Sequence, residues 1–376
     1  MNILFINYEF PPLGGGAGNA CSFLSRAFQK RGHEVVILTS AFQEQTGYSN
    51  FEGCHLYRIK VPREKKAQAS TYEMAAFVFK AWFHLGSIVK KHKIDHAIIF
   101  FSIPCGPLGT YLKLRWNIPY INSLRGGDVP GLVRDLDTIH KIITPIRRYV
   151  LSKAIATVAN ADGLANLSRA ADPNKIDVIH NGVDASYYHP VHSIRFTTGF
   201  HFIFVGRFHE QKNLHYCLKS FKKFVDDYPD CTLHLIGDGP LRGDLEKLST
   251  ELNLTEHLKW HGWKGKGDIK KLYQQCHCMI NPSHYEGMPN TVLEAMASGL
   301  PVIASNIPGN NDLVHDNENG FLFELKHETG LLDCFNKILT HPDVNKLGTK
   351  SRDIILKNFS WEIVAEAYEK ILIERG

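Results

Sequence analysis

Residues 281–305 read NPSHYEGMPNTVLEAMASGLPVIAS, and this stretch decides the fold. An apolar run ends near Ser283, a short loop follows, and NTVLEAMA then has the spacing of a helix. Gly299 and Pro301 end that helix, and LPVIAS begins a new apolar strand. Strand, loop, helix and strand in this order are typical of a parallel α/β sheet.

The start of the predicted helix is a candidate anion site. We expect Asn290 to cap the helix, so that the positive end of its dipole lies behind the loop residues Gly287, Met288 and Pro289. Backbone N–H groups at this place would meet the charge of a diphosphate without a dedicated metal.

Two carboxylates frame this loop. Glu286 and Glu294 are separated by seven residues, one before the helix and one in its first or second turn. An ionised carboxylate only accepts hydrogen bonds, so each would suit the hydroxyl groups of a sugar or a ribose beside the phosphates. The alternative for Glu294 is that it only complements the helix dipole.

The first half of the chain shows the same alternation of strand and helix. Strands are predicted at 2–7, 34–40, 96–102 and 119–124, and one long helix over 136–159. Continuous apolar runs of this kind are expected of strands that are buried on both faces of a sheet.

A second series of elements follows a stretch rich in turn-forming residues near Asn181. Its first strand is FHFIFVG, and its further strand candidates are CTLHLIG, LKWHG, CHCMINPS and LPVIAS. A length of 376 residues suits two domains. The sequence therefore predicts two Rossmann-like domains, each with ligands beyond the carboxyl ends of its strands.

The stretch HYEGMPNTVLEAMASGLPVIAS resembles the donor-binding segment of the retaining glycosyltransferases of family 4, which have the GT-B fold. In that family a Glu, seven residues and a second Glu precede an Ala-Met-Ala-x-Gly-x-Pro-Val stretch. The resemblance implies that Glu294 holds the ribose of the nucleotide and that Glu286 lies against the donor sugar.

Other parts of the chain are similar to the same family in the same order. Arg207, within FVGR, and Lys212 match two cations that contact the donor diphosphate in the family. The signature Asn181-Gly182-Val183-Asp184 matches its interdomain segment, and Gly237-Asp238-Gly239-Pro240 matches a loop near the nucleotide. FSWEIVAEAYEKIL resembles the C-terminal helix that crosses back onto the first domain.

The glycines near residue 15 do not form a dinucleotide-binding motif. The spacing G-x-G-x-x-G fails because Asn19 and Cys21 occupy its third glycine position. The loop instead resembles the PP-x-GG element of the same transferases, in which Gly15 and Gly16 would let the backbone approach the donor phosphate and the acceptor.

The acceptor side departs from the family pattern. Many relatives carry His-Gly after the strand equivalent to PYINSL, whereas Arg125 occupies the His position here. Arg is not a base at neutral pH, so we expect Arg125 to bind a phosphate, a carboxylate or sugar hydroxyls, and Asp128 to contact the acceptor. A second departure is Asp312, with Asn310 and Asn311, where relatives often have Gly-Gly and Glu.

The resemblance implies an α/β, GT-B architecture of two Rossmann-like domains whose parallel sheets face each other across a cleft. We expect an acceptor-binding domain over 1–185, a nucleotide-sugar-binding domain over 186–357 and a C-terminal helix over 358–376.

The implied activity is transfer of a sugar from a nucleoside diphosphate sugar to a hydroxyl, with retention of configuration and without a metal or another cofactor. Its catalytic residues would be Glu286, Arg207, Lys212 and Arg125. Two alternatives stay open: another GT-B enzyme that acts on the nucleotide sugar alone, such as an epimerase, and a sugar-nucleotide-binding protein without turnover.

The composition predicts a globular cytoplasmic protein. Hydrophobic residues make up 44% of the chain and charged residues 22%, and no apolar stretch approaches the about 18 residues of a membrane span. The N-terminal segment does not resemble a signal peptide, and the eight cysteines are therefore expected to be reduced thiols of the core.

Positive charge is concentrated in the first half. Residues 1–190 carry 22 Lys and Arg against 14 Asp and Glu, and the segments 58–93 and 147–153 mix the cations with aromatic and aliphatic residues. This pattern would suit contact with the anionic inner face of the plasma membrane, and it permits a glycan or lipid-linked acceptor. We expect no nucleic acid as partner. A solvated basic helix face is the equal alternative.

Overall fold

The computed structural model describes residues 1–13, 15–63, 69–131 and 137–376. Contacts divide the chain into two compact units, of which unit 1 is Met1–Gly182 with Trp361–Gly376 and unit 2 is Val183–Ser360. The domain limits predicted from sequence, at 185 and 358, lie within three residues of these crossings.

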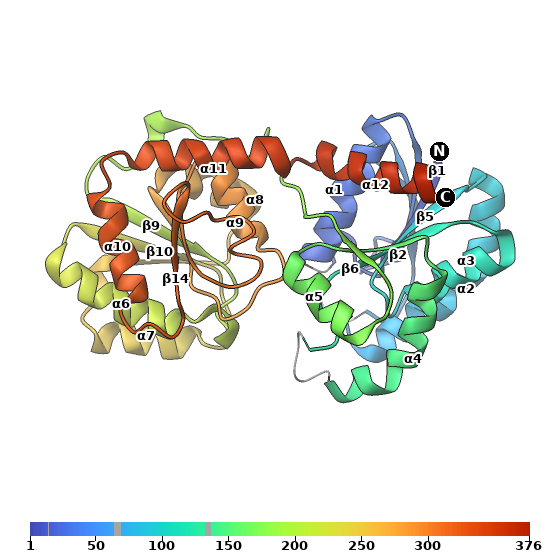
Figure 1. Cartoon of the computed structure of the whole chain (residues 1–376), viewed down its shortest axis with the longest axis horizontal. Coiled ribbons are helices and arrows are strands. Elements are labelled where there is room, and N and C mark those ends of the chain that lie inside the picture. Colours follow the sequence, from blue (N-terminus) through green and yellow to red (C-terminus); the bar gives the residue numbers. More distant parts are fainter. Residues whose placement is uncertain (14, 64–68, 132–136) are drawn as a thin grey trace. The chain divides into compact units, whose positions relative to one another are not determined.

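The described strands of unit 1 form an eight-stranded sheet in the order β3-β4-β2-β1-β5-β6-β7-β8. Figure 1 labels β1, β2, β5 and β6 of this sheet. Among the described strands, only β3 runs antiparallel to its neighbour. The strands are β1 (Asn2–Ile6), β2 (Glu34–Ser40), β3 (Gly47–Phe51), β4 (Cys54–Ile59), β5 (His96–Phe100), β6 (Tyr120–Leu124), β7 (Ala156–Ala159) and β8 (Ile176–Val178). Almost every side chain of β1, β2 and β5 is buried, which explains their continuous apolar runs.

Six helices of the described part of unit 1 cover this sheet. They are α1 (Gly16–Lys30), α2 (Thr71–His92), α3 (Gly106–Trp116), α4 (Asp137–Lys153), α5 (Asp162–Ala171) and α12 (Trp361–Arg375). α1 packs against α12, whereas α3 contacts both α2 and α4. The C-terminal helix is thus part of unit 1, although the chain passes through unit 2 before it.

Aromatic and polar contacts fix α12 on unit 1. The ring of Trp361 stacks on Phe23 with a centroid distance of 5.5 Å, and the Tyr368 and Ser123 hydroxyls lie 2.8 Å apart. A Cβ on Gly182 would lie 2.8 Å from the backbone nitrogen of Trp361. Only glycine therefore fits where the chain leaves unit 1.

The sequence-based helix over 136–159 is wrong in its last part. α4 ends at Lys153, and residues 156–159 form β7, which pairs with β6. The β-branched residues Thr157 and Val158 favour a strand, and the tertiary pairing decides between the two states. Leu136 lies outside the described residues.

Unit 2 contains a parallel six-stranded sheet in the order β11-β10-β9-β12-β13-β14. Its strands are β9 (Phe200–Val205), β10 (Cys231–Ile236), β11 (Leu258–Gly262), β12 (Cys278–Asn281), β13 (Val302–Ser305) and β14 (Gly320–Phe323). Its helices are α6 (Leu214–Asp227), α7 (Arg242–Glu251), α8 (Lys266–Gln275), α9 (Asn290–Ala297), α10 (Gly330–Thr340) and α11 (Val344–Asn358).

Two cores, formed by different helices, lie against the sheet of unit 2. Phe221 of α6 and Phe335 of α10 belong to one core, and Tyr273 of α8, Val292 of α9 and Ile355 of α11 belong to the other. Both units are therefore α/β layers around a mainly parallel sheet, which confirms the predicted fold class.

The cysteines agree with the sequence-based expectation. All eight are buried free thiols, and Cys278 lies in β12. Among the helices of the described residues, none has both the length and the apolar character that crossing a membrane requires.

Candidate functional site

The predicted donor residues of unit 2 lie at one edge of its sheet. Gly237 directly follows β10, Arg207 follows β9 by one residue, and the loop 284–289 follows β12. These three strands are neighbours in the order β10-β9-β12. Their carboxyl ends meet at the place where ligands bind in parallel sheets.

Gly237 lets two strand ends approach each other. Its φ is +132°, and a Cβ there would lie 1.9 Å from the carbonyl oxygen of Gly206. The chain can therefore close over β9 only with glycine at this position. Arg207, which follows Gly206 beyond the end of β9, has an exposed side chain.

A cation and an anion are paired at the same edge. Lys212 ends the short helix η3 (Glu210–Lys212), and its Nζ donates to Glu286 Oε1 over 2.5 Å. The two side chains are only 15% and 8% exposed. The hydroxyl of Ser283 lies 2.7 Å from the same carboxylate oxygen. Both charged groups are thus held in place before any ligand arrives.

Backbone contacts join the η3 segment to the loop after β12. The amide of His284 donates to the carbonyl of Gln211 over 2.8 Å, and Gln211 Nε2 donates to the carbonyl of Tyr285 over 2.8 Å. Gln211 and Tyr285 are 74 residues apart in the sequence. This connection was not predicted from the sequence.

A buried polar network supports the loop from below. Asn281 Nδ2 donates to Asn310 Oδ1 over 2.7 Å, and Asn310 Nδ2 donates to the carbonyl of Ser305 over 3.1 Å. The Ser283 hydroxyl lies 2.9 Å from Asn281 Oδ1. Asn310, noted from sequence only as a departure from the family, therefore connects the ends of β12 and β13.

The helix start differs from the prediction in one respect. α9 begins at Asn290, but Pro289 occupies the N-cap position, and no side-chain cap hydrogen bond forms there in the described structure. The predicted N-cap at Asn290 is therefore wrong. The Met288 side chain is 8% exposed and packs in the core, so only its backbone can face a ligand. Gly287, by contrast, is partly exposed.

Glu294 lies in the second turn of α9, between two tyrosines. Burial raises the pKa of its carboxyl to about 7, and hydrogen bonds from Tyr188 and Tyr273 and the charge of Lys266 oppose this shift. α9, which is described throughout, has no acidic residue in its first turn. Because Glu294 is beyond that turn, the helix dipole alone does not account for it. Its two tyrosine partners were not predicted from the sequence.

In unit 1, Arg125 follows β6 directly and is held by its neighbours. Its Nη1 donates to Asn181 Oδ1 over 2.6 Å, and its guanidinium carbon lies 4.4 Å from the centroid of the Phe100 ring. Asn181 belongs to the signature that the sequence identified at the domain crossing. That signature therefore also orients Arg125.

Asp128 supports the Arg125 loop instead of facing solvent. The residue is 3% exposed. Its carboxylate accepts hydrogen bonds from the Ser102 amide (2.6 Å) and hydroxyl (3.0 Å) and from the amides of Arg125 (3.0 Å) and Gly126 (3.1 Å). The predicted acceptor contact of Asp128 stays a prediction that this geometry does not favour, because the carboxylate is already engaged.

The glycines of the first loop lie at the start of α1. Gly15 occupies the N-cap position, Gly16 is the first helical residue, and a Cβ on Gly15 would meet no heavy atom of the described residues within 4 Å. The amide of Gly15 hydrogen-bonds to Glu9, whose pKa is raised mainly by burial. Sequence reasoning missed Glu9, although its position shortly after β1 is a signal that could have found it.

Another part of unit 1 contains three side chains that lie close enough together to bind one metal ion. Among its described residues, Glu34, His55 and His92 bring ligand atoms within 4.8 Å of one another. None of them was selected from the sequence.

Comparisons with known proteins give matches over both units. The family model described as "Glycosyltransferase Family 4" matches residues 14–187, and the model described as "Glycosyl transferases group 1" matches residues 192–354. An uncharacterised glycosyltransferase of Methanocaldococcus jannaschii is 25% identical over 375 residues, which cover 100% of this chain and 98% of that protein.

Two further matches are informative. The UDP-Gal:alpha-D-GlcNAc-diphosphoundecaprenol alpha-1,3-galactosyltransferase of Escherichia coli is 33% identical over 202 residues, and this match spans 50% of the chain and 51% of that relative. Among solved structures, sucrose-phosphate synthase from Thermosynechococcus elongatus superposes with a TM-score of 0.84 at 20% identity, covering 99% of this chain and 98% of the other.

Proposed function

The chain belongs to the group 1 glycosyltransferases of the GT-B fold, which use a nucleotide-sugar donor, and we propose that it transfers a sugar to the hydroxyl of an acceptor. The transferred group would be a hexosyl or amino-sugar residue, and the acceptor a glycan or a lipid-linked molecule. The anomeric configuration would be retained. The observation that carries the proposal is the largely buried ion pair of Lys212 and Glu286, held at the strand edge where α9 begins.

The donor diphosphate would lie against the start of α9. Arg207 and Lys212 supply positive charge there, and the helix N-terminus adds backbone donors. Lys212 is already fixed, so little reorganisation is needed when negative charge develops on the leaving group. Glu286 would then accept hydrogen bonds from the sugar, and Glu294 from the ribose.

Transfer would follow a front-face displacement. The bond between the anomeric carbon and the donor phosphate oxygen breaks while the bond to the acceptor oxygen forms on the same face. The proton of the acceptor hydroxyl passes to the leaving diphosphate. The protein's part is to orient the donor and to stabilise this charge, and neither a metal nor another cofactor is needed in the proposal.

Arg125 is assigned to the acceptor. Its guanidinium is oriented by Asn181 and Phe100, and a fixed Arg suits a phosphate or a carboxylate of the acceptor. The name of the Escherichia coli relative includes a diphosphoundecaprenol-linked acceptor. A lipid diphosphate is therefore the first acceptor to test.

Donor consumption tests the function. The enzyme is incubated with UDP-galactose and other nucleotide sugars, with and without a lipid-diphosphate-linked GlcNAc acceptor, and the released nucleoside diphosphate is measured. We expect acceptor-dependent release, an alpha-linked product from an alpha-linked donor by NMR, and unchanged rates in EDTA. A changed sugar without diphosphate release would identify an epimerase, and donor binding without release would identify a binding protein. An inverted anomeric centre would refute retention.

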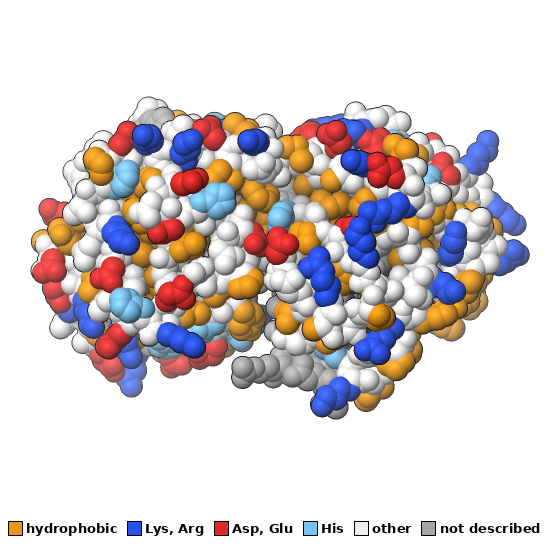
Figure 2. Space-filling model, viewed as in Figure 1, with side chains coloured by type: hydrophobic (Ala, Val, Ile, Leu, Met, Phe, Trp, Pro, Cys, Tyr) orange, Lys and Arg blue, Asp and Glu red, His pale blue; other side chains and the backbone are white. Residues whose placement is uncertain are grey.

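Contact with an anionic membrane is proposed for unit 1. α2 and α4 expose large apolar side chains, and Figure 2 shows hydrophobic and basic side chains interspersed over the region that Figure 1 labels α2–α4. The exposed apolar residues are Tyr72, Phe79, Trp82 and Phe83 on α2, and Ile139, Ile142, Ile146 and Tyr149 on α4. Lys80, Lys90, Lys141, Arg148 and Lys153 belong to the same helices. Apolar groups with surrounding cations suit an anionic bilayer surface.

Vesicle flotation checks this contact. Phe79 and Phe83 are 67% and 71% exposed, so the double change Phe79→Ser with Phe83→Ser should leave the fold intact. We expect it to reduce binding to vesicles that contain phosphatidylserine about tenfold or more, because two rings that would insert into the bilayer surface are lost. Trp263→Ser, at a 77% exposed residue of unit 2, is the matched control. Equal flotation of both variants and the wild type would contradict the proposal.

A further inference from the structure

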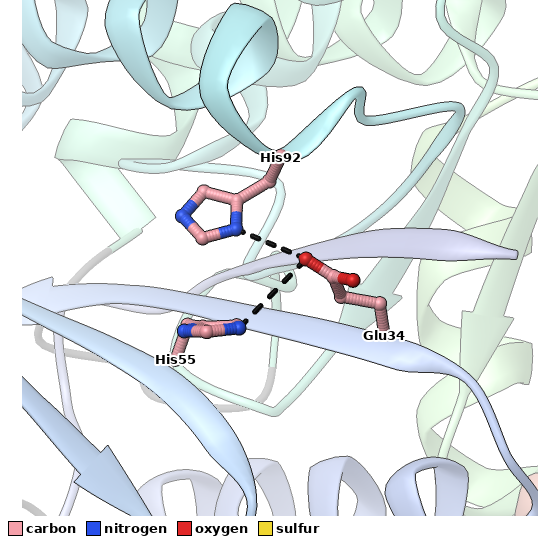
Figure 3. A group of neighbouring side chains, drawn as sticks. All are labelled: Glu34, His55 and His92. Atoms are coloured by element: carbon pink, nitrogen blue, oxygen red, sulfur yellow. Dashed lines mark hydrogen bonds and ion pairs between the residues drawn. The ribbon is translucent and has the colours of Figure 1, made fainter.

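Glu34, His55 and His92 converge from three elements of unit 1 (Figure 3). Glu34 is the first residue of β2, His55 is the second residue of β4, and His92 ends α2. His92 Nδ1 lies 3.1 Å and His55 Nε2 lies 3.7 Å from the same oxygen, Glu34 Oε1. The His92 side chain is 5% exposed, whereas Glu34 and His55 are 46% and 31% exposed, so the group is open to solvent on one side.

The outward nitrogens of both imidazoles contact tyrosine hydroxyls. Tyr48 Oη lies 2.9 Å from His55 Nδ1, and Tyr57 Oη lies 2.8 Å from His92 Nε2. When each outward nitrogen donates its proton to a hydroxyl, each inward nitrogen presents a lone pair toward Glu34. Fixed outer partners of this kind orient the histidines of metal sites.

The spacing of the inward atoms fits a tetrahedral ion. Zinc bonds to nitrogen and carboxylate oxygen measure about 2.0–2.1 Å, which places two tetrahedral ligand atoms about 3.3 Å apart. The two distances to Glu34 Oε1, 3.1 and 3.7 Å, lie on either side of this value. We propose that Glu34, His55 and His92 bind one Zn²⁺, with water as the fourth ligand on the open side.

The position of this site indicates a structural role. It lies at the amino ends of β2 and β4, whereas Arg125 and Gly15 follow the carboxyl ends of β6 and β1 in the same sheet. A bound ion would join β2, β4 and the end of α2. Lys91 donates a hydrogen bond to the Tyr57 hydroxyl over 3.1 Å, and the positive charge of this lysine disfavours a cation at the site.

Metal titration of the full-length protein tests the inference. After dialysis against EDTA, Zn²⁺ binding is measured by calorimetry, and Co²⁺ binding by its visible absorption. We expect one saturable Zn²⁺ per chain, the intense Co²⁺ bands of four-coordinate geometry, and a thermal midpoint several degrees higher with zinc. Glu34→Gln and His55→Gln should each weaken zinc binding more than tenfold. His96→Gln, which breaks a His–carboxylate pair with Asp95, is the matched control and should bind as the wild type.

The readout is independent of sugar transfer. The midpoints of the metal-free variants show whether they fold, and both changed side chains are partly exposed. Absence of saturable zinc binding, or the same affinity in Glu34→Gln, His55→Gln and the wild type, would overturn the site. Chelation that lowers the thermal midpoint but leaves the transfer rate unchanged would support a structural ion and leave the proposed reaction intact.

Discussion

Lys212→Ala is expected to lower kcat for sugar transfer by about 10²- to 10³-fold, the usual cost of removing one preorganised group that stabilises charge in the transition state. In the structure the Lys212 side chain is 15% exposed, and its ammonium group is bound to Glu286 at the edge where α9 begins. The measurement is steady-state release of nucleoside diphosphate at saturating donor and acceptor. Lys222→Ala, at a partly exposed residue of α6, removes a Lys that also pairs with a carboxylate and should leave kcat unchanged.

A second variant separates charge stabilisation from folding. Lys212→Ala leaves the nearly buried Glu286 carboxylate with less compensation, which is itself destabilising. The double change Lys212→Met with Glu286→Gln removes both charges at similar volume, so stability should recover while activity stays lost. Recovery of activity in the double variant would mean that Lys212 acts only by neutralising Glu286.

Much of the fold follows from local sequence because strands buried on both faces leave continuous apolar runs. β1, β2 and β9 were located in this way, and their bounds agree with the structure within one or two residues. The hairpin of β3 and β4 was missed, since GYSNF is polar and mostly exposed and so lacks such a run. The position of the hairpin depends on the pairing of β4 with β2, and no local pattern encodes this pairing.

The local arrangement of Glu286 and Glu294 was predictable for a similar reason, whereas their contacts with a donor stay a prediction. Glu286 lies in the loop after β12 and Glu294 lies in α9, which follows it directly, so the local elements alone set how the two residues are placed relative to each other. The environment of Glu294 was not predictable, because Tyr188 approaches it from 106 residues earlier in the chain. In unit 1 the same limit applies to Asp128, whose burial depends on contacts with Ser102.

Glu294→Gln is expected to weaken donor binding about tenfold or more, since a hydrogen bond to a charged group contributes about 1.5–3 kcal/mol. Burial raises the pKa of the wild-type carboxyl to about 7. If the ionised form binds the ribose hydroxyls, donor affinity should increase as the pH rises from about 6 to 8 and then level off. Calorimetry across this range should show the dependence in the wild type, and a flat profile in the Gln variant.

The same carboxyl should make unit 2 less stable above neutral pH. Its pKa in the folded protein is about 7, compared with an ordinary value of 4.5, so the folded state keeps a proton that the unfolded chain has lost. Stability from this group is therefore complete below pH 4.5 and decreases as the pH rises to about 7, by at most about 3 kcal/mol. Glu294→Gln should then unfold at higher denaturant concentration than the wild type at pH 8, but not at pH 4.

Together the two measurements decide what Glu294 does. Glu256→Gln, at an exposed carboxylate in η4 (Thr255–His257), controls for the loss of one charge and should change neither quantity. A residue that only fills the core would alter stability without altering donor affinity. Weaker donor binding with higher stability at pH 8 is the combination expected of a carboxylate kept in an unfavourable environment because it binds the nucleotide. Unchanged donor affinity in Glu294→Gln would refute the ribose contact, whatever the stability shows.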